Sequence, residues 1–357
     1  MNIIQIFKEL VSIDSPSGEE SAISQYIIAW AEKHNFSIKK DKLGNLVIRT
    51  NNKKPAKVFF SGHLDTVEPG RGIVCVEKNG YLTSSGKTIL GADNKASLAG
   101  ILHAISTYNI SPLPSIELVF TTEEETIMNS QFINPKIITA PVGYIFDAPF
   151  EFGGIVTASP YIQDFSCIIT GVASHASTPH EANSVFPILK NIVEGIPCGY
   201  IQNNPAFGTI NIGMVSMGTG VNTIPGNLEI KGEIRSFDKK IFILKKKEIE
   251  NFFKTFKKEN KKYTVDFVFK NYAAGYVHKE SSILVSNAKQ ALENIGRKVH
   301  MMRPQSVSDA NHFNGFGIPT LVIAEGTQFA HTTRERISTK DLTDISNLVS
   351  AIITMYR

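Results

Sequence analysis

Hydrophobic positions in the first part of the chain alternate between helical and strand-like spacing. Apolar residues recur every three or four positions over residues 2–12, 18–34 and 95–108, which predicts three amphipathic helices. Short apolar runs at 47–49, 58–61, 116–121 and 142–147 are typical of buried strands. A further helix is expected near Ser130. Strands that alternate with helices predict a largely parallel, doubly wound sheet.

The pattern changes after about residue 159. Strand-like stretches at 165–171, 209–216 and 228–235 accompany a helical stretch at 182–194. In the last strand Leu228, Ile230 and Ile234 share one face and charged residues occupy the other. This alternation predicts an antiparallel sheet with one wet face, and with two helices it would form an α+β unit of ferredoxin-like character.

Strand and helix alternate again from about residue 281, with a helix expected at 284–295 and a strand at 319–324. The 357 residues exceed the size of one ordinary domain. The simplest interpretation is an α/β catalytic domain in two pieces, residues 1–159 and 272–357. An α+β lid or dimerisation domain, residues 160–271, would be inserted between them.

Composition narrows the class of protein. A hydrophobic content of 42% suits a globular chain, and a net charge of +4 gives no reason to expect nucleic-acid binding. No apolar stretch approaches the roughly 20 residues that span a membrane, and the N-terminus does not resemble a secretory signal. Three scattered cysteines indicate reduced thiols. We therefore expect a cytoplasmic protein that binds neither nucleic acid nor a membrane.

One stretch, residues 239–262, is rich in lysine, with apolar residues interleaved at nearly helical spacing. It could be a helix that lies on a membrane surface. It could also be an amphipathic helix that covers a sheet and exposes a basic face to solvent. We favour the second interpretation.

Polar residues that can bind metal follow or border the apolar runs. In open α/β sheets, ligands collect outside the carboxyl ends of the strands, so such residues can converge on one point. Two histidines and several carboxylates form a possible two-metal set: His63, Asp93, Glu123 to Glu125, Asp147 and His331.

Each of these residues also has a purely structural interpretation. His63 and Asp65 project to the same face of a strand end, as a metal-ligand histidine and its carboxylate partner would, or as a structural hydrogen-bonded pair. Asp93 could bridge two cations or cap a helix. The glutamates could form a solvated acidic loop. Alternatively, one could bind a metal while its neighbour takes a proton from the metal-bound water.

Asp147 and His331 also have both a metal-binding and a structural interpretation. Asp147 ends a core strand, where a lone charge is costly unless it is paired or ligated. His331, taken alone, could be an ordinary surface histidine.

The combined motifs resemble the dizinc aminoacylase/carboxypeptidase family, and its peptidase T (tripeptide aminopeptidase) branch in particular. They occur in the family's order and cover nearly the whole chain. Lys95 and the His-Thr-Thr ending resemble that branch more than the deacylase branches. The resemblance rests on Gly62-His63-Leu64-Asp65-Thr66, Gly91-Ala92-Asp93-Asn94-Lys95-Ala96, Phe120-Thr121-Thr122-Glu123-Glu124-Glu125, Asp147 and His331-Thr332-Thr333.

The resemblance implies two Zn²⁺ per subunit, which Co²⁺ or Mn²⁺ could replace. Asp93 would bridge both ions, and Glu124 would be the general base. It also implies a cis peptide bond between Asp93 and Asn94. The remaining ligands would be His63 and Asp147 at one zinc, and Glu125 and His331 at the other.

In the inserted domain, residues 171–177 resemble the family's lid motif. His175 would reach the active site of the other subunit of a homodimer and stabilise the oxyanion, unless it is an ordinary sheet histidine. Asn222 and Arg235 match positions that hold the substrate carboxylate or backbone. A guanidinium suits that task because it pairs two oxygens at once, although Arg235 could equally form a surface salt bridge.

Three departures from the family affect the expected cleft. Ser97 occupies a position where glycine is usual, Glu123 one where a small residue is common, and residues 306–311 lack the usual glycines. We expect a zinc-dependent hydrolase of small peptides, most simply a tripeptide aminopeptidase. The alternatives are a carboxypeptidase or N-acyl-amino-acid deacylase of the same family, and a non-catalytic peptide-binding protein.

Overall fold

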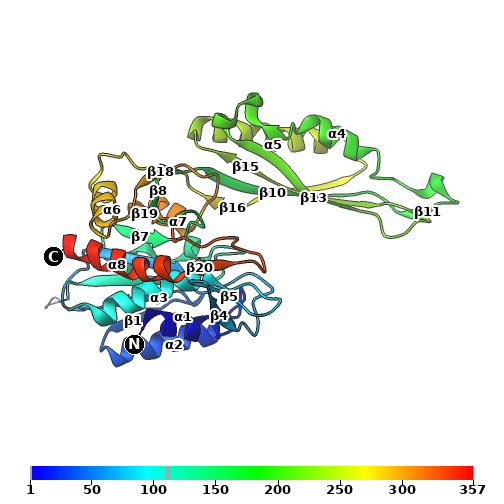
Figure 1. The fold of residues 1–357 in the computed structure, drawn as a ribbon. Coiled ribbons are helices and arrows are strands. Elements are labelled where there is room, and N and C mark those ends of the chain that lie inside the picture. The colour runs from blue at the N-terminus through cyan, green and yellow to red at the C-terminus, as the bar shows by residue number, and fades with distance from the viewer. Residues whose placement is uncertain (1, 110–112, 357) are drawn as a thin grey trace. The chain divides into compact units, whose positions relative to one another are not determined.

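The computed structural model describes residues 2–109 and 113–356 and divides the chain into two compact units (Figure 1). The first consists of Met1–Ala158, Val277–Pro304 and Ser308–Arg357, and the second of Ser159–Tyr276 and Gln305–Val307. The second unit, green to yellow in Figure 1, is an insertion. It extends five residues beyond the expected end at residue 271 and gains three residues from a later segment.

The first unit is built on a mixed eight-stranded sheet whose centre is parallel. β3 pairs in parallel with β6 and β7, and β7 with β19, which confirms the expected fold class. The order is β1 (Ser37–Lys40), β2 (Leu46–Arg49), β6 (Ile116–Thr121), β3 (Val58–His63), β7 (Gly143–Phe146), β19 (Thr320–Ile323), β8 (Gly154–Val156) and β18 (His300–Met302).

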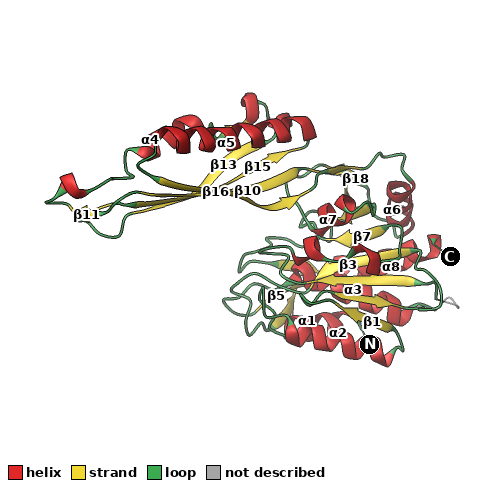
Figure 2. Ribbon diagram, turned by 180° about the vertical axis from the view of Figure 1, so that it is seen from behind, coloured by secondary structure: helices red, strands yellow, loops and turns green. Residues whose placement is uncertain are grey.

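Helices cover both faces of this sheet. The larger apolar core contains residues of α1 (Ile3–Val11), α2 (Ser21–Lys33), α3 (Ala92–Thr107), α6 (Ile283–Asn294) and α8 (Thr339–Met355), the helices drawn in red around the strands of this unit in Figure 2. α3 and α8 approach closely because Gly100 has no side chain: a Cβ there would lie 2.3 Å from Ile345 Cγ2. On the other face α7 (Asp309–Gly315) packs Phe313 against Phe59.

The remaining elements of the first unit are short. β4 (Cys75–Lys78), β5 (Tyr81–Ser84) and β20 (Arg336–Ser338) form a three-stranded sheet. The helix expected near Ser130 is a single 3₁₀ turn, η1 (Asn129–Phe132), followed by η2 (Pro135–Ile137). β9 (Ala158–Ser159) and β17 (Tyr276–Val277) lie at the boundary between the units.

The second unit is a five-stranded antiparallel sheet with two helices, α4 (Ile188–Gly195) and α5 (Lys239–Glu259). The order is β12 (Gly199–Tyr200), β13 (Thr209–Met217), β15 (Asn227–Ser236), β10 (Tyr161–Thr170) and β16 (Thr264–Ala273). Its four long strands and two helices follow the ferredoxin-like pattern, completed by β16, which the sequence analysis did not identify. The small elements are β11 (Ser174–His175), β14 (Thr223–Ile224), η3 (Pro179–Glu181), η4 (Ile201–Asn203) and η5 (Pro205–Phe207).

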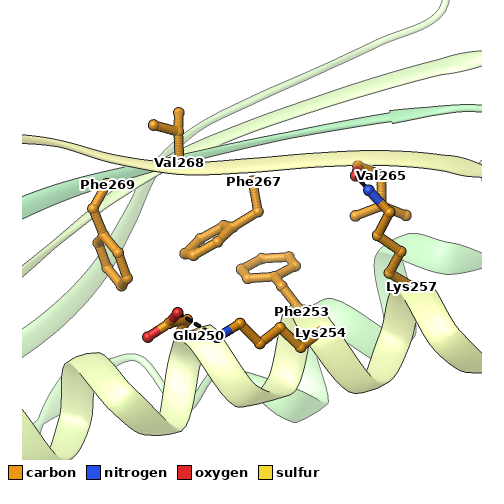
Figure 3. Close-up of a pocket in the computed structure, with 8 residues that line it drawn as sticks. All are labelled: Glu250, Phe253, Lys254, Lys257, Val265, Phe267, Val268 and Phe269. Carbon is orange, nitrogen blue, oxygen red and sulfur yellow. Dashed lines mark hydrogen bonds and ion pairs between the residues drawn. The ribbon is translucent and has the colours of Figure 1, made fainter.

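The lysine-rich stretch forms α5, which covers this sheet, as the favoured interpretation predicted. Asp238 caps the helix by accepting hydrogen bonds from the backbone N–H groups of Lys240 and Ile241. Figure 3 shows Phe253 stacked on Phe267 of β16, with ring centroids 4.5 Å apart, while lysines line the rim. Within the described part of the chain, no helix is long and apolar enough to cross a membrane.

Candidate metal centre

Most of the candidate metal ligands lie where the central strands end. β3, β6 and β7 run in parallel, with His63 beside Thr121 and Ser61 beside Ile145. The residues that follow β3, β6 and β7 therefore reach the same edge of the sheet. Asp93 joins them from the first turn of α3, and His331 from the loop after β19.

The side chains meet around Asp93. His63 Nε2 lies 3.2 Å from Asp93 Oδ1 and 3.9 Å from Asp147 Oδ1. His331 Nε2 lies 3.3 Å from Asp93 Oδ2 and 2.8 Å from Glu125 Oε1. Asp93 thus belongs to two groups of three possible ligands, and within each group the ligand atoms lie within 4.8 Å of one another. The structure brings together all five residues expected to bind metal, which are His63, Asp93 and Asp147 in one group and Asp93, Glu125 and His331 in the other.

The hydrogen bonds around the histidines suit metal binding. His63 Nδ1 lies 2.9 Å from the carbonyl oxygen of Asp65. Because a carbonyl only accepts, Nδ1 carries a proton, which leaves Nε2 as the nitrogen that would bind a metal ion in the neutral ring. The buried Glu125 Oε1 lies 2.8 Å from His331 Nε2. An imidazole nitrogen and a carboxylate oxygen that face each other in this way can both bind one cation.

The electrostatics of the site also favour bound cations. Burial, reinforced by neighbouring carboxylates, raises the pKa of Glu124 and of Asp147 well above the usual range. Burial also opposes the charged forms of His63 and Asp93. Hydrogen bonds to Asp65 and Asp93 nevertheless raise the pKa of His63. Hydrogen bonds from His331 and His63 lower the pKa of Asp93. Carboxylates packed this closely repel one another unless a positive charge lies between them.

Asp65 organises the turn that carries the glutamates. It is fully buried, and its carboxylate accepts hydrogen bonds from Ser17 Oγ at 2.7 Å and from the backbone N–H groups of Glu124 at 2.9 Å and Glu125 at 3.1 Å. Its Oδ1 also lies 3.3 Å from His63 Nδ1. Asp65 therefore orients both a histidine and the two glutamates, a wider role than the sequence suggested.

The peptide bond between Asp93 and Asn94 is cis, as the resemblance implied. Glu335, which was not among the residues expected at the site, holds this segment in place. Its carboxylate accepts hydrogen bonds from the backbone N–H groups of Leu90, Gly91 and Asp93 at 2.7–3.0 Å. Its only signal in the sequence is its place four residues after His331.

Two other buried acids near the site were also missed. Asp309 accepts hydrogen bonds from the hydroxyls of Thr121 and Ser130. Glu325 contacts Asn94 and Ser97. Asp309 lies within residues 306–311, which depart from the family pattern, and neither acid was expected to have a role at the site.

The other candidate residues belong to the second unit. His175 pairs with Thr223 in the short β11–β14 ladder, and the carbonyl of Asn222 accepts a hydrogen bond from Ala176 N at 2.9 Å. Arg235 lies in β15, where Nε and Nη2 donate to the carboxylate of Glu233 at 2.7 and 2.8 Å and Nη1 donates to the carbonyl of Gln305. His175 and Asn222 are thus neighbours, and Arg235 already has partners.

Known proteins resemble the chain over nearly its full length. The profile of Peptidase family M20/M25/M40 matches residues 59–355. Uncharacterized protein YqjE of Bacillus subtilis (strain 168) is 28% identical over 367 positions, covering 98% of this chain and 97% of its own. Aminopeptidase PepT from Bacillus cereus ATCC 10987 has a similar crystal structure, with a TM-score of 0.85, 31% identity and coverage of 99% and 98% of the two chains. The crystal structure of a tripeptidase from Staphylococcus aureus subsp. aureus Mu50 is also similar, with a TM-score of 0.88 and 28% identity. The likeness covers 99% of this chain and 97% of the tripeptidase chain.

These likenesses confirm the resemblance found in the motifs. The matched profile includes the whole segment from β3 to α8, and hence every residue of the cluster around Asp93. The chain belongs to peptidase family M20/M25/M40 and is a metallopeptidase of small peptides.

Proposed function

We propose that the chain is a dizinc aminopeptidase that removes the N-terminal residue of tripeptide-like substrates. The observation that carries the proposal is the position of Asp93, whose Oδ1 faces His63 and whose Oδ2 faces His331. A carboxylate placed in this way can hold two cations about 3.5–4 Å apart. Likeness to an aminopeptidase and a tripeptidase supports the substrate class.

The donor set fits zinc, which takes imidazole nitrogen and carboxylate oxygen. His63 and Asp147 would hold one ion, Glu125 and His331 the other, and Asp93 both. Co²⁺ or Mn²⁺ could occupy the same donors. Bound zinc would lower the pKa of a water toward about 7 and polarise the scissile carbonyl.

Glu124 is the group that we assign to proton transfer. It is buried, and its pKa is raised by that burial and by the charge of Asp147, which suits an acid–base group at neutral pH. In this role its carboxylate accepts the proton of the attacking water and passes it to the leaving amine. Asp65 keeps the turn in place through the backbone N–H of Glu124.

The inserted unit would act as a lid and as the contact between two subunits. His175 Nδ1 accepts a hydrogen bond from the backbone N–H of Ser177 at 3.2 Å, so the proton of the neutral ring is on Nε2. That N–H is the kind of donor that stabilises an oxyanion. We assign it to the site of the partner subunit, and Asn222 and Arg235 to the backbone or carboxylate of the substrate.

A small peptide panel tests the proposed reaction. Ala-Ala-Ala, its N-acetylated form and an N-acetyl amino acid should be incubated with the zinc-loaded enzyme and with chelator-treated enzyme, and the products identified. We expect free alanine and Ala-Ala from the unblocked tripeptide alone, and none after chelation. Release of the C-terminal residue from the blocked peptide would indicate a carboxypeptidase, and cleavage of the acetyl group a deacylase. No turnover of any substrate would indicate a peptide-binding protein.

The proposed location is the cytoplasm. The three cysteines are free thiols, as is usual in a reducing compartment.

A further inference from the structure

A buried acid outside the proposed ligand set lies against the segments that carry the ligands. Glu325, just after β19, has no solvent exposure. Its Oε2 lies 2.9 Å from Ser97 Oγ and 3.2 Å from Asn94 Nδ2. Burying a carboxyl group is costly unless its hydrogen bonds are satisfied, so this position calls for a reason.

Glu325 holds the strand end that carries Asp147 from both sides. Its backbone N–H donates to the carbonyl of Ala148, the residue after Asp147. Its two side-chain partners, Ser97 and Asn94, both donate to the carbonyl of Phe146, the residue before Asp147, at 2.5 and 2.6 Å.

The same contacts reach Asp93. Asn94 is the next residue in the chain, and its side chain is tightly enclosed: a Cβ on Gly62 would lie 2.4 Å from Asn94 Oδ1. A shift of Glu325 therefore moves Asn94, and with it the carboxylate of Asp93 relative to that of Asp147.

The hydrogen count at Ser97 shows how this contact is made. The Ser97 hydroxyl has one hydrogen, yet its oxygen lies within hydrogen-bond distance of both the Phe146 carbonyl and Glu325 Oε2. Both contacts are satisfied when Ser97 donates to the carbonyl and accepts from a protonated Glu325. Burial, together with the charges of Asp93 and Asp147, raises the pKa of Glu325 well above its usual range, in agreement with a neutral acid.

We propose that Glu325 is a positioning residue, acting through Ser97 and Asn94, that sets the separation of the Asp93 and Asp147 carboxylates for metal binding. The inference rests on the proposed metal centre. It also accounts for Ser97, which stands where the resembling family usually has glycine: a glycine there would remove the hydroxyl that Glu325 and Phe146 share.

Zinc affinity, measured by competition with a chromophoric chelator, tests the proposal. We expect Glu325→Ala to weaken zinc binding by about 10–100-fold, the usual effect of removing a group that supports metal ligands. At limiting zinc kcat should fall while KM stays constant, and excess zinc should restore kcat. Glu325→Gln, whose amide N–H can donate to Ser97 as the protonated acid does, should retain most of the affinity. An affinity of Glu325→Ala within twofold of wild type would overturn the inference.

A double-mutant cycle identifies the partner. Ser97→Gly should weaken zinc binding when Glu325 is present and weaken it less in the Glu325→Ala background, because the two residues share one contact. Independent losses that add in full would contradict the proposed path. The matched control is Tyr144→Phe on β7, which removes buried hydrogen bonds to Tyr356 and Leu284. It should lower the unfolding temperature and leave zinc affinity unchanged.

Wild-type protein provides the last comparison. If it binds no zinc, the proposed metal centre fails and the inference fails with it. If it binds zinc normally and Glu325→Ala does too, only the role of Glu325 is overturned.

Discussion

The carboxylate of Asp65 accepts a hydrogen bond from the backbone N–H of Glu124 at 2.9 Å, across 59 positions of the chain. The residue proposed to support a metal-binding histidine thus also fixes the turn of the proposed general base. The same carboxylate accepts from Glu125 N, so a single buried acid links one ligand of each zinc to the proton-transfer group.

Replacing Asp65 by Asn should therefore damage more than one function. The amide nitrogen would face N–H donors where the carboxylate now accepts, so at least one hydrogen bond of the turn is lost. We expect kcat and zinc affinity each to fall by about 10–100-fold, measured on Ala-Ala-Ala and by chelator competition. Ser17→Ala, which removes only the hydroxyl donor to Asp65, should cost much less. Equal losses in the two variants would contradict the role of the backbone contacts.

Glu124→Gln tests the base. General acid–base catalysis contributes about 10²–10⁴-fold, so kcat should fall by that amount while zinc content stays near two per chain. The cluster also contains His63, Glu124 and Glu125 within ligand distance, so a loss of one zinc would instead identify Glu124 as a ligand. Glu123→Gln is the control, since Glu123 accepts a hydrogen bond from Asn129 and, although the sequence made it a candidate, lies in none of the groups of possible ligands among the described residues. It should keep activity within a few-fold of wild type.

The sequence predicted the strand ends, and the candidate ligands that the structure brings together, because each depends on local pattern. A short apolar run followed by a histidine or acid, as at His63 and Asp147, identifies both the strand and the residue that leaves the core. Glu335 and Glu325 could not be found in this way. Their roles come from backbone N–H groups and side chains more than 200 positions away, which no local periodicity reports.

In the inserted unit too, local sequence pattern predicted some elements and not others. α5 was expected because its apolar residues recur at helical spacing, and Asp238 caps it. β16 was missed because its inner face is only partly buried and its outer positions are mixed, which obscures the alternation. α4 begins at Ile188 rather than near residue 182, because Pro187 favours the start of a helix and not its interior.

The stability of the metal-free protein should fall as pH rises. Burial raises the folded-state pKa of Glu124 and Asp147, and hydrogen bonds to Asp93 and Glu125 raise that of His331 to about 10. Each group then binds its proton more tightly in the folded state. The stabilisation that these three groups contribute therefore decreases as the pH rises from about 5 through about 10.

Zinc should reverse this trend. Zinc competes with protons for the same ligand atoms, so its affinity, and the stabilisation that it gives, increase with pH. The difference in unfolding temperature between zinc-loaded and chelator-treated protein should widen from about pH 6 to about pH 9. Thermal unfolding followed by circular dichroism measures it. A gap that narrows over this range would contradict the assignment of these groups as ligands.

The substitution Arg235→Ala tests whether Arg235 binds the C-terminal carboxylate of the substrate. Three of its five N–H groups are used by Glu233 and Gln305, which leaves two donors for a substrate carboxylate. Arg235→Ala should raise KM for Ala-Ala-Ala by about tenfold or more and change KM little for the C-terminal amide. Lys231→Ala, which breaks a comparable ion pair with Glu229 on the same strand, is the control. An equal rise in KM for both peptides would restrict Arg235 to a structural role.

His175 tests whether the site is shared between subunits. Glu124→Ala chains keep the imidazole, and His175→Ala chains keep the base, so neither homodimer should have full activity. A mixed dimer has one site with every group present. If the imidazole acts in trans, equal mixing with free subunit exchange should restore about a quarter of wild-type activity.

The control for this experiment lacks the complementing histidine. His175→Ala chains are mixed with chains that carry both Glu124→Ala and His175→Ala, and this mixture should show no recovery. Subunit exchange is verified independently with two chains of different mass, so that a failed exchange is not mistaken for a negative result. If exchange is complete and the first mixture remains inactive, His175 does not serve the partner's site.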